Sequence, residues 1–96
     1  VYAPGSLTAT LAKGSAEGTT IATISAGNTG TTYAYKVNPT ARATYNQTSG
    51  SYSGTALTSG TTEIAVSVGD VIEIVNLSSS KVVAVTYVTA AADKIK

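Results

Sequence analysis

The 96-residue sequence contains no cysteine, histidine, methionine, tryptophan or phenylalanine. Without cysteine and histidine, the chain has no disulfide, no thiolate nucleophile, no imidazole base and none of the usual zinc or haem ligands. Charged residues make up only 11% of the sequence and the net charge is +1, so no basic surface for nucleic acid is expected. We therefore predict a protein that is not an enzyme, needs no cofactor and binds no nucleic acid.

Small residues dominate what is present. Threonine (17), alanine (15), serine (11) and glycine (9) make up more than half of the chain, and six tyrosines are the only aromatic residues. The larger apolar residues are mainly valine and isoleucine, which with threonine favour β-strands. The length fits one domain over residues 1–96. The longest mainly apolar stretch, Val82–Ala92, is far shorter than the roughly 20 residues that cross a bilayer, so we expect no membrane insertion.

Turn-forming clusters of glycine, proline, asparagine and serine divide the chain into runs of strand length. These runs predict strands at about Ser6–Ala12, Thr19–Ser25, Thr31–Val37, Ala41–Tyr45, Thr62–Val68, Val71–Leu77 and Lys81–Thr89. Such a series predicts an all-β fold, an immunoglobulin-like β-sandwich of about seven antiparallel strands. A five- or six-stranded barrel is the alternative.

Alternation of apolar and polar residues predicts which side chains face the core. The predicted inward residues are Leu7, Ala9, Leu11, Tyr33, Tyr35, Val37, Ile64, Val66, Val68, Ile72 and Ile74. Glu73, between two of them, is predicted to face outward. The run Lys81–Val88 is apolar on both faces, so this strand is either central in its sheet or covered from outside the module.

Two predicted strands, Thr31–Tyr35 and Ala41–Tyr45, carry very little charge. If they lie at a sheet edge, they offer unpaired backbone groups to another chain. A central position in the sheet is the alternative.

From about Gly18 onward, the order and spacing of several segments are similar to a known type of module. The segments are Gly18-Thr19-Thr20-Ile21, Tyr35-Lys36-Val37, Thr58-Ser59-Gly60, Ile64 to Val75, Lys81-Val82-Val83 and Ala91 to Lys96. This part of the chain resembles the immunoglobulin-like β-sandwich repeats of large Gram-positive cell-surface and S-layer-associated proteins. It departs from them at Leu77–Lys81, where such modules usually have an Asp/Asn-Gly turn. It also departs at Ala41–Ala56, which is a longer stretch of serine, threonine and tyrosine than such modules are expected to have.

The resemblance implies a non-catalytic spacer or lattice module on the outside of a bacterial cell, with no catalytic residues to carry over. Its expected partners are neighbouring modules or copies of itself. The low charge and the many threonine and serine residues also favour an extracellular location. A second possibility is a fibre subunit that assembles by strand addition, with Val1–Ala12 as the donated strand.

The acidic residues and the hydroxyl residues give no catalytic or metal-binding pattern. Asp70 follows Gly69 in a short connection, where aspartate stabilises a turn by bonding nearby backbone. The chain has no calcium-binding loop of alternating acidic residues, and no serine has the spacing to a lysine base that a nucleophile needs. We expect the carboxylates to be structural.

The tyrosines give the one candidate binding surface. Tyr33 and Tyr35 are predicted to fill the core, whereas Tyr45 and Tyr52 lie in or beside a Ser/Thr/Gly-rich stretch and are predicted to be exposed. Exposed aromatic rings beside amides are typical of sugar-binding surfaces. An alternative function is therefore a carbohydrate-binding module for cell-wall polysaccharide. Its possible ligand surface consists of Tyr45, Asn46, Gln47 and Tyr52.

Overall fold

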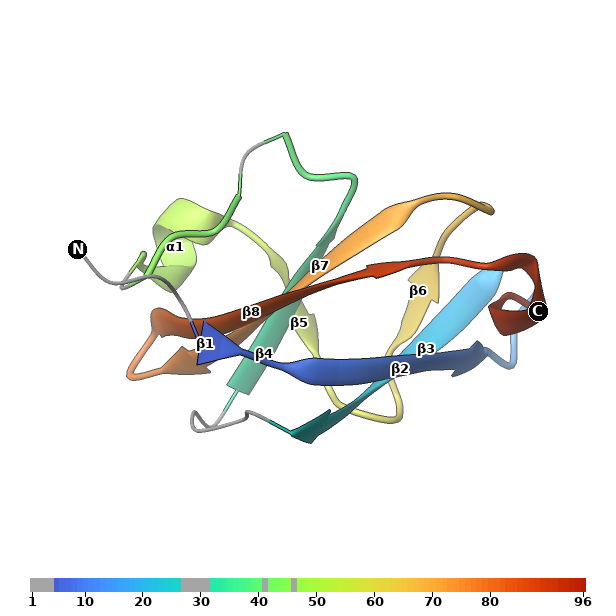
Figure 1. Cartoon of the computed structure of the whole chain (residues 1–96), viewed down its shortest axis with the longest axis horizontal. Helices are drawn as coiled ribbons and strands as arrows, with labels where there is room; N and C mark the ends of the chain where they lie inside the picture. Colours follow the sequence, from blue (N-terminus) through green and yellow to red (C-terminus); the bar gives the residue numbers. More distant parts are fainter. Residues whose placement is uncertain (1–4, 27–31, 41, 46) are drawn as a thin grey trace.

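The computed structural model of the protein describes residues 5–26, 32–40, 42–45 and 47–96, and in it two β-sheets pack face to face (Figure 1). The smaller sheet contains β2 (Thr8–Lys13), β3 (Thr19–Ala26) and β6 (Glu63–Ala65). The larger sheet contains β1 (Gly5–Ser6), β4 (Thr32–Val37), β5 (Thr55–Leu57), β7 (Val71–Ser78) and β8 (Lys81–Thr89). A one-turn helix, α1 (Ser49–Tyr52), and a 3-10 turn, η1 (Ala92–Lys94), complete the described elements.

The order of the strands is immunoglobulin-like. The smaller sheet has the order β2-β3-β6, which matches strands A-B-E of immunoglobulin domains. The larger sheet has the order β1-β8-β7-β4-β5, in which β8-β7-β4 match strands G-F-C. All described pairings are antiparallel except that of β1 with β8. Only Leu7 separates β1 from β2, so one run of chain joins both sheets in turn. Counted as one strand, it brings the described strands to the seven predicted, and the predicted all-β sandwich is confirmed.

The core between the two sheets contains most of the side chains that the alternation assigned to it, together with Ala22, Ile24, Leu57 and Ala84, which it did not assign. Leu7, Leu11, Ile64, Ile72 and Ile74 are all buried there, and Tyr33, Tyr35 and Val37 pack against them. The prediction for Val68 is wrong. Its side chain is 67% exposed, because β6 ends at Ala65 and the following turn carries Val68 away from the sheet.

The strand predicted at Ala41–Tyr45 is also wrong. Ala41 lies outside the described residues, and residues 42–45 form no strand. The N–H groups of two of them bond to side chains instead of to a neighbouring strand. Ala43 N–H donates to Glu73 Oε2 at 3.0 Å, and Thr44 N–H donates to Gln47 Oε1 at 3.0 Å. The strand that pairs with β4 is instead β5, and β4 lies between β5 and β7. The alternative of a central position therefore holds for the described part of Thr31–Tyr35.

Residues 42–45 and 47–54, named here the covering segment, lie on the outer face of the larger sheet, away from β2 and β3 (Figure 1). They close a second apolar cluster, which consists of Ala34, Ala43, Tyr52, Val75, Leu77 and Val82 with Val85 packed against it. This cluster explains why the run Lys81–Val88 is apolar on both faces. Its strand, β8, is central between β1 and β7, and its outer face is partly covered within the same chain.

The helix of the covering segment presses one aromatic ring into the sheet. The Thr48 hydroxyl accepts from Ser51 N–H at the start of α1, and Ser53 ends the helix in the left-handed conformation with φ of 56°. Tyr52 at the end of the helix is 1% exposed. Gly54 approaches the ring so closely that a Cβ at this position would overlap it. The tyrosine is therefore enclosed by its own turn as well as by the sheet.

Candidate functional site

The surface predicted to bind a ligand, Tyr45, Asn46, Gln47 and Tyr52, is not assembled as expected. Tyr45 is 37% exposed, but Tyr52 is buried, so the prediction that both rings are open to solvent is wrong for Tyr52. Gln47 is half-buried, and its side-chain oxygen accepts a hydrogen bond from the N–H of Thr44 in the same loop. Asn46 lies outside the described residues. The structure thus brings no pair of exposed tyrosines together here.

A different group of side chains is brought together on the outer face of the larger sheet. Lys36 of β4 lies opposite Glu73 of β7, and Glu73 lies opposite Tyr87 of β8, so the three form a row across the sheet. Glu73 does alternate to the outer face, but the expectation that it faces water is wrong, since its exposure is 0%. The covering segment shields it, with Ala43 and Tyr52 packed over this face.

The Glu73 carboxylate ties three parts of the chain together. Its Oε2 accepts from the Tyr87 hydroxyl at 2.6 Å and from the Ala43 N–H at 3.0 Å. Its Oε1 and the hydroxyl of Tyr52 are buried, and neither has a hydrogen-bond partner among the described residues. A buried carboxylate with one unpaired oxygen costs free energy. Against that cost, Glu73 fixes the covering segment and a β8 side chain to β7.

Both tyrosines around Glu73 are held in their neutral form. Burial, followed by the hydrogen bond to Glu73, raises the pKa of Tyr87 to about 12. Burial also raises the pKa of Tyr52, and the Glu73 carboxylate, which lies near the Tyr52 hydroxyl but outside hydrogen-bond geometry, raises it further. Both hydroxyls therefore stay protonated at neutral pH. Lys36 adds a cation above the Tyr52 ring, with Nζ 4.5 Å from the ring centre.

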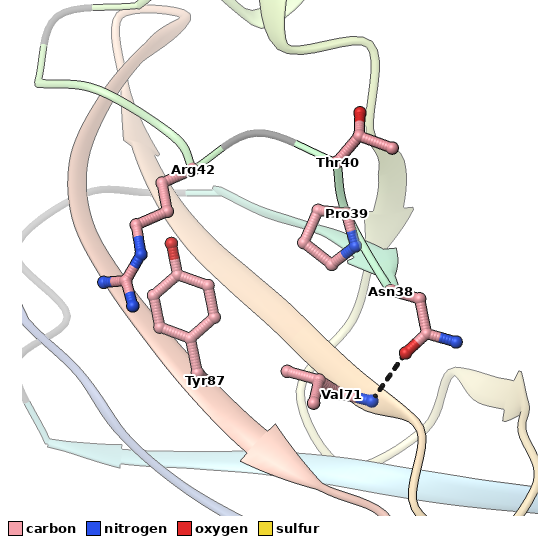
Figure 2. Close-up of a pocket in the computed structure, with 6 residues that line it drawn as sticks. All are labelled: Asn38, Pro39, Thr40, Arg42, Val71 and Tyr87. Atoms are coloured by element: carbon pink, nitrogen blue, oxygen red, sulfur yellow. Dashed lines mark hydrogen bonds between the residues drawn. The ribbon is translucent and has the colours of Figure 1, made fainter.

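An open pocket lies beside this row (Figure 2). It has a volume of about 460 Å³ and is lined by Asn38, Pro39, Thr40, Arg42, Val71 and Tyr87. Figure 2 shows Arg42 and Tyr87 on one side and Pro39 and Asn38 on the other, with β7 and β8 behind. The Arg42 guanidinium lies over the Tyr87 ring, with Cζ 4.9 Å from the ring centre. An aromatic ring, a proline and a cation thus surround one hollow.

Sequence reasoning missed this site. The sequence pattern places Arg42 only within a predicted strand that does not exist, and Tyr87 only within an apolar run. A usable signal was Glu73, the single carboxylate in an otherwise apolar run from Val71 to Val75, since such a residue needs buried donors if the strand is covered on both faces. The sequence does not show that the covering segment lies over this face of the sheet.

A second carboxylate, Glu63, organises the turn between β2 and β3. Its Oε1 accepts from Ser15 N–H and Ala16 N–H, each at 2.8 Å, and its Oε2 accepts from the Ser15 hydroxyl at 2.7 Å. The Thr19 hydroxyl also donates to Oε1. The hydrogen bond from the Ser15 hydroxyl, followed by that from Ala16 N–H, lowers the pKa of Glu63 to about 2. The charged carboxylate therefore favours the folded turn.

We predict that protonation of Glu63 removes this contribution. Because the folded pKa is depressed, the stabilisation is complete above the usual value of 4.5 and is lost as the pH falls from there to about 2. In acid titrations followed by urea unfolding, Glu63→Gln should show a smaller loss of stability over this range than the unmodified chain. Glu17→Gln, at an exposed carboxylate with no hydrogen bond within the described residues, is the matched control and should keep the full pH dependence. Equal slopes for Glu63→Gln and the unmodified chain would contradict the assignment.

The remaining prediction for an acidic residue, the turn role of Asp70, is confirmed. Its Oδ2 accepts from Ser67 N–H at 2.9 Å and its Oδ1 from the Asn38 side chain at 3.1 Å. The Ser67 N–H, and then the Asn38 amide, lower the pKa of Asp70. The described residues contain no cluster of three or more metal-ligating side chains. Within the same ranges, no helix has the length and apolar character needed to span a bilayer.

Comparison of the chain with protein-family models, with curated proteins and with solved structures gave no match. The strand order alone defines the fold class, which is an immunoglobulin-like β-sandwich.

Proposed function

We propose that this chain is a non-catalytic structural module of a bacterial surface or S-layer protein. It acts as a spacer between neighbouring modules and as a contact unit between copies. The proposal joins the resemblance of Gly18–Lys96 to Gram-positive surface repeats with the geometry of the sandwich, and it places the protein outside the cell.

The observation that carries the proposal is the position of the two ends. β1 lies toward one end of the molecule and the C-terminus lies at the other, along a longest dimension of 39 Å (Figure 1). Lys96 is fixed at its end, where its carbonyl accepts from Gly18 N–H at 2.9 Å and its N–H donates to Thr19 O at 3.1 Å. A chain that enters at one end and leaves at the other adds length when modules are joined in series.

The use of the carboxylates supports the same proposal. Three carboxylates accept hydrogen bonds from backbone N–H groups of a turn or loop and so stabilise the fold; they belong to Glu63, Asp70 and Glu73. Strand donation to a neighbour has less support, because residues 5–6 pair with β8 and residues 8–13 pair with β3 of the same chain. The two leucines between and within these strands, Leu7 and Leu11, are buried in their own core.

A two-copy chain tests the spacer role. Two modules joined head to tail by a short linker should give an elongated particle in small-angle X-ray scattering, with a maximum dimension close to twice that of one module. Each copy should unfold at the urea midpoint of the single module. A compact particle in which the copies fold side by side would contradict the spacer role. As a control, a two-copy chain with a long glycine-serine linker shows whether the short linker determines how the two modules are arranged.

Accessibility on intact cells tests the location. An antibody raised against the module should label intact cells of the source bacterium as strongly as broken ones. Labelling that appears only after the cells are broken would contradict a surface location, whatever the scattering experiment shows.

A further inference from the structure

We propose that the pocket between Pro39 and Tyr87 binds a carboxylate-bearing pyranose, such as a hexuronate unit of an acidic polysaccharide, with Arg42 as the carboxylate-binding residue. This goes beyond the spacer role and does not depend on it. The location also differs from the surface predicted at Tyr45, Asn46, Gln47 and Tyr52.

Arg42 is the only arginine of the chain, and its guanidinium has no acidic partner within the described residues. It lies over the ring of Tyr87. The N–H donors of a guanidinium lie in its plane and form a fork, and those of Arg42 have no acceptor within the described residues. A carboxylate accepts two parallel hydrogen bonds from such a fork.

One buried atom holds the two groups on either side of Arg42. Glu73 Oε2 accepts both from the N–H of Ala43, the next residue in the chain, and from the hydroxyl of Tyr87, the ring beneath the guanidinium. The backbone that carries the cation and the ring that supports it are therefore tied to the same point on β7. A binding group held in this way loses less conformational freedom when a ligand arrives.

The other lining residues suit a sugar ring. Pro39 and Val71 supply apolar surface for the C–H face of a pyranose, and Thr40 has a side-chain hydroxyl without a partner among the described residues. The Asn38 side chain is held in place at the edge of the pocket, because its Oδ1 accepts from Val71 N–H at 2.9 Å and its Nδ2 donates to Asp70. The volume of about 460 Å³ falls within the range of small-ligand pockets, about 300–1,000 Å³.

The charge around the pocket favours a carboxylate over a phosphate. Arg42 is the only cation among the residues that line it, and the Asp70 carboxylate is bonded to the lining residue Asn38. Asp70 and Glu73, which is bonded to Tyr87, repel any anion, and they repel a doubly charged phosphate about twice as strongly as a singly charged carboxylate. With Arg42 as the cation of the lining, a carboxylate is therefore the better match.

Titration of the isotope-labelled protein, followed by two-dimensional NMR, tests the proposal. The probes are a hexuronate trisaccharide and a neutral hexose trisaccharide of the same linkage. We expect saturable shifts with the acidic probe at millimolar concentrations, centred on residues 38–42 and Tyr87, and none of this pattern with the neutral probe. Arg42→Gln should weaken binding by about tenfold or more, and Arg42→Lys, which keeps the charge but loses the fork, should lie between. Lys81→Gln, at an exposed cation at the start of β8, should bind as the unmodified chain does.

Four results would overturn the proposal. They are the absence of shifts up to about 10 mM of the acidic probe, equal shifts with the neutral probe, equal losses in Arg42→Gln and Lys81→Gln, and equal binding of a short peptide through its C-terminal carboxylate. The last result would assign the pocket to carboxylates in general and remove the sugar from the proposal.

Discussion

Replacement of Tyr52 by alanine should lower the free energy of unfolding by about 3–5 kcal/mol, the usual cost of removing a large aromatic side chain from a core. Tyr52 is 1% exposed and belongs to the cluster beneath the covering segment, with Val75, Leu77 and Val82. Its loss leaves a cavity that Gly54, with no side chain, cannot fill. Urea unfolding at neutral pH measures the change.

The matched variant Tyr52→Phe separates the ring from its hydroxyl. The hydroxyl is buried and has no partner among the described residues, so its removal should change the stability by no more than about 1 kcal/mol, in either direction. A loss of stability as large as that of Tyr52→Ala would show that the hydroxyl is bonded in the folded protein. A small effect of both variants would show that the ring is not buried.

Replacement of Glu73 by alanine should cost about 2–4 kcal/mol, because it leaves the Ala43 N–H without an acceptor in a buried place, removes the partner of the Tyr87 hydroxyl and opens a cavity. The same urea titration measures it. The expected loss comes from the donors that Glu73 holds rather than from its charge.

Glu73→Gln tests that distinction. The amide oxygen of glutamine can accept both existing hydrogen bonds, and its NH₂ group can donate toward the Tyr52 hydroxyl oxygen, while the cost of a buried charge disappears. We expect the stability of Glu73→Gln to lie within about 1 kcal/mol of the unmodified chain, or above it. A loss equal to that of Glu73→Ala would mean that the negative charge itself stabilises the fold.

These results also decide how a glycan-binding experiment must be designed. Tyr52→Ala would lose binding through its lost stability, so it cannot report on a sugar surface. Among the described members of the predicted surface, Tyr45 is the exposed aromatic residue, and Tyr45→Ala is the substitution that leaves the second cluster intact.

The inner faces of both sheets could be predicted from the sequence because they obey a simple rule. Side chains alternate with a period of two along a strand, and every inner face meets the same core, so Leu7, Leu11, Ile72 and Ile74 were assigned correctly. Val68 failed because alternation does not show where a strand ends. The chain leaves the sheet three residues before Val68, and the pattern continues into the turn by coincidence.

The outer face of the larger sheet could not be predicted in the same way. The alternation places Glu73 opposite the core but does not say whether water or another part of the chain covers that face. The cover depends on hydrogen bonds between residues about 30 positions apart, Ala43 and Glu73, inside a stretch rich in small residues that favour no single secondary structure. For the same reason the pocket of Arg42 and Tyr87 is visible only in three dimensions.

The central structural claim is that the buried Glu73 carboxylate holds the covering segment on the sheet, and hydrogen exchange of the Ala43 amide tests it most directly. Ala43 lies outside any strand or helix, yet its N–H bonds to a fully buried acceptor. The account predicts that this amide exchanges as slowly as the amides of β7 in the unmodified chain, and that Glu73→Ala removes its protection while β7 keeps its own. Exchange of the Ala43 amide at the rate of an open loop in the unmodified chain would contradict the account.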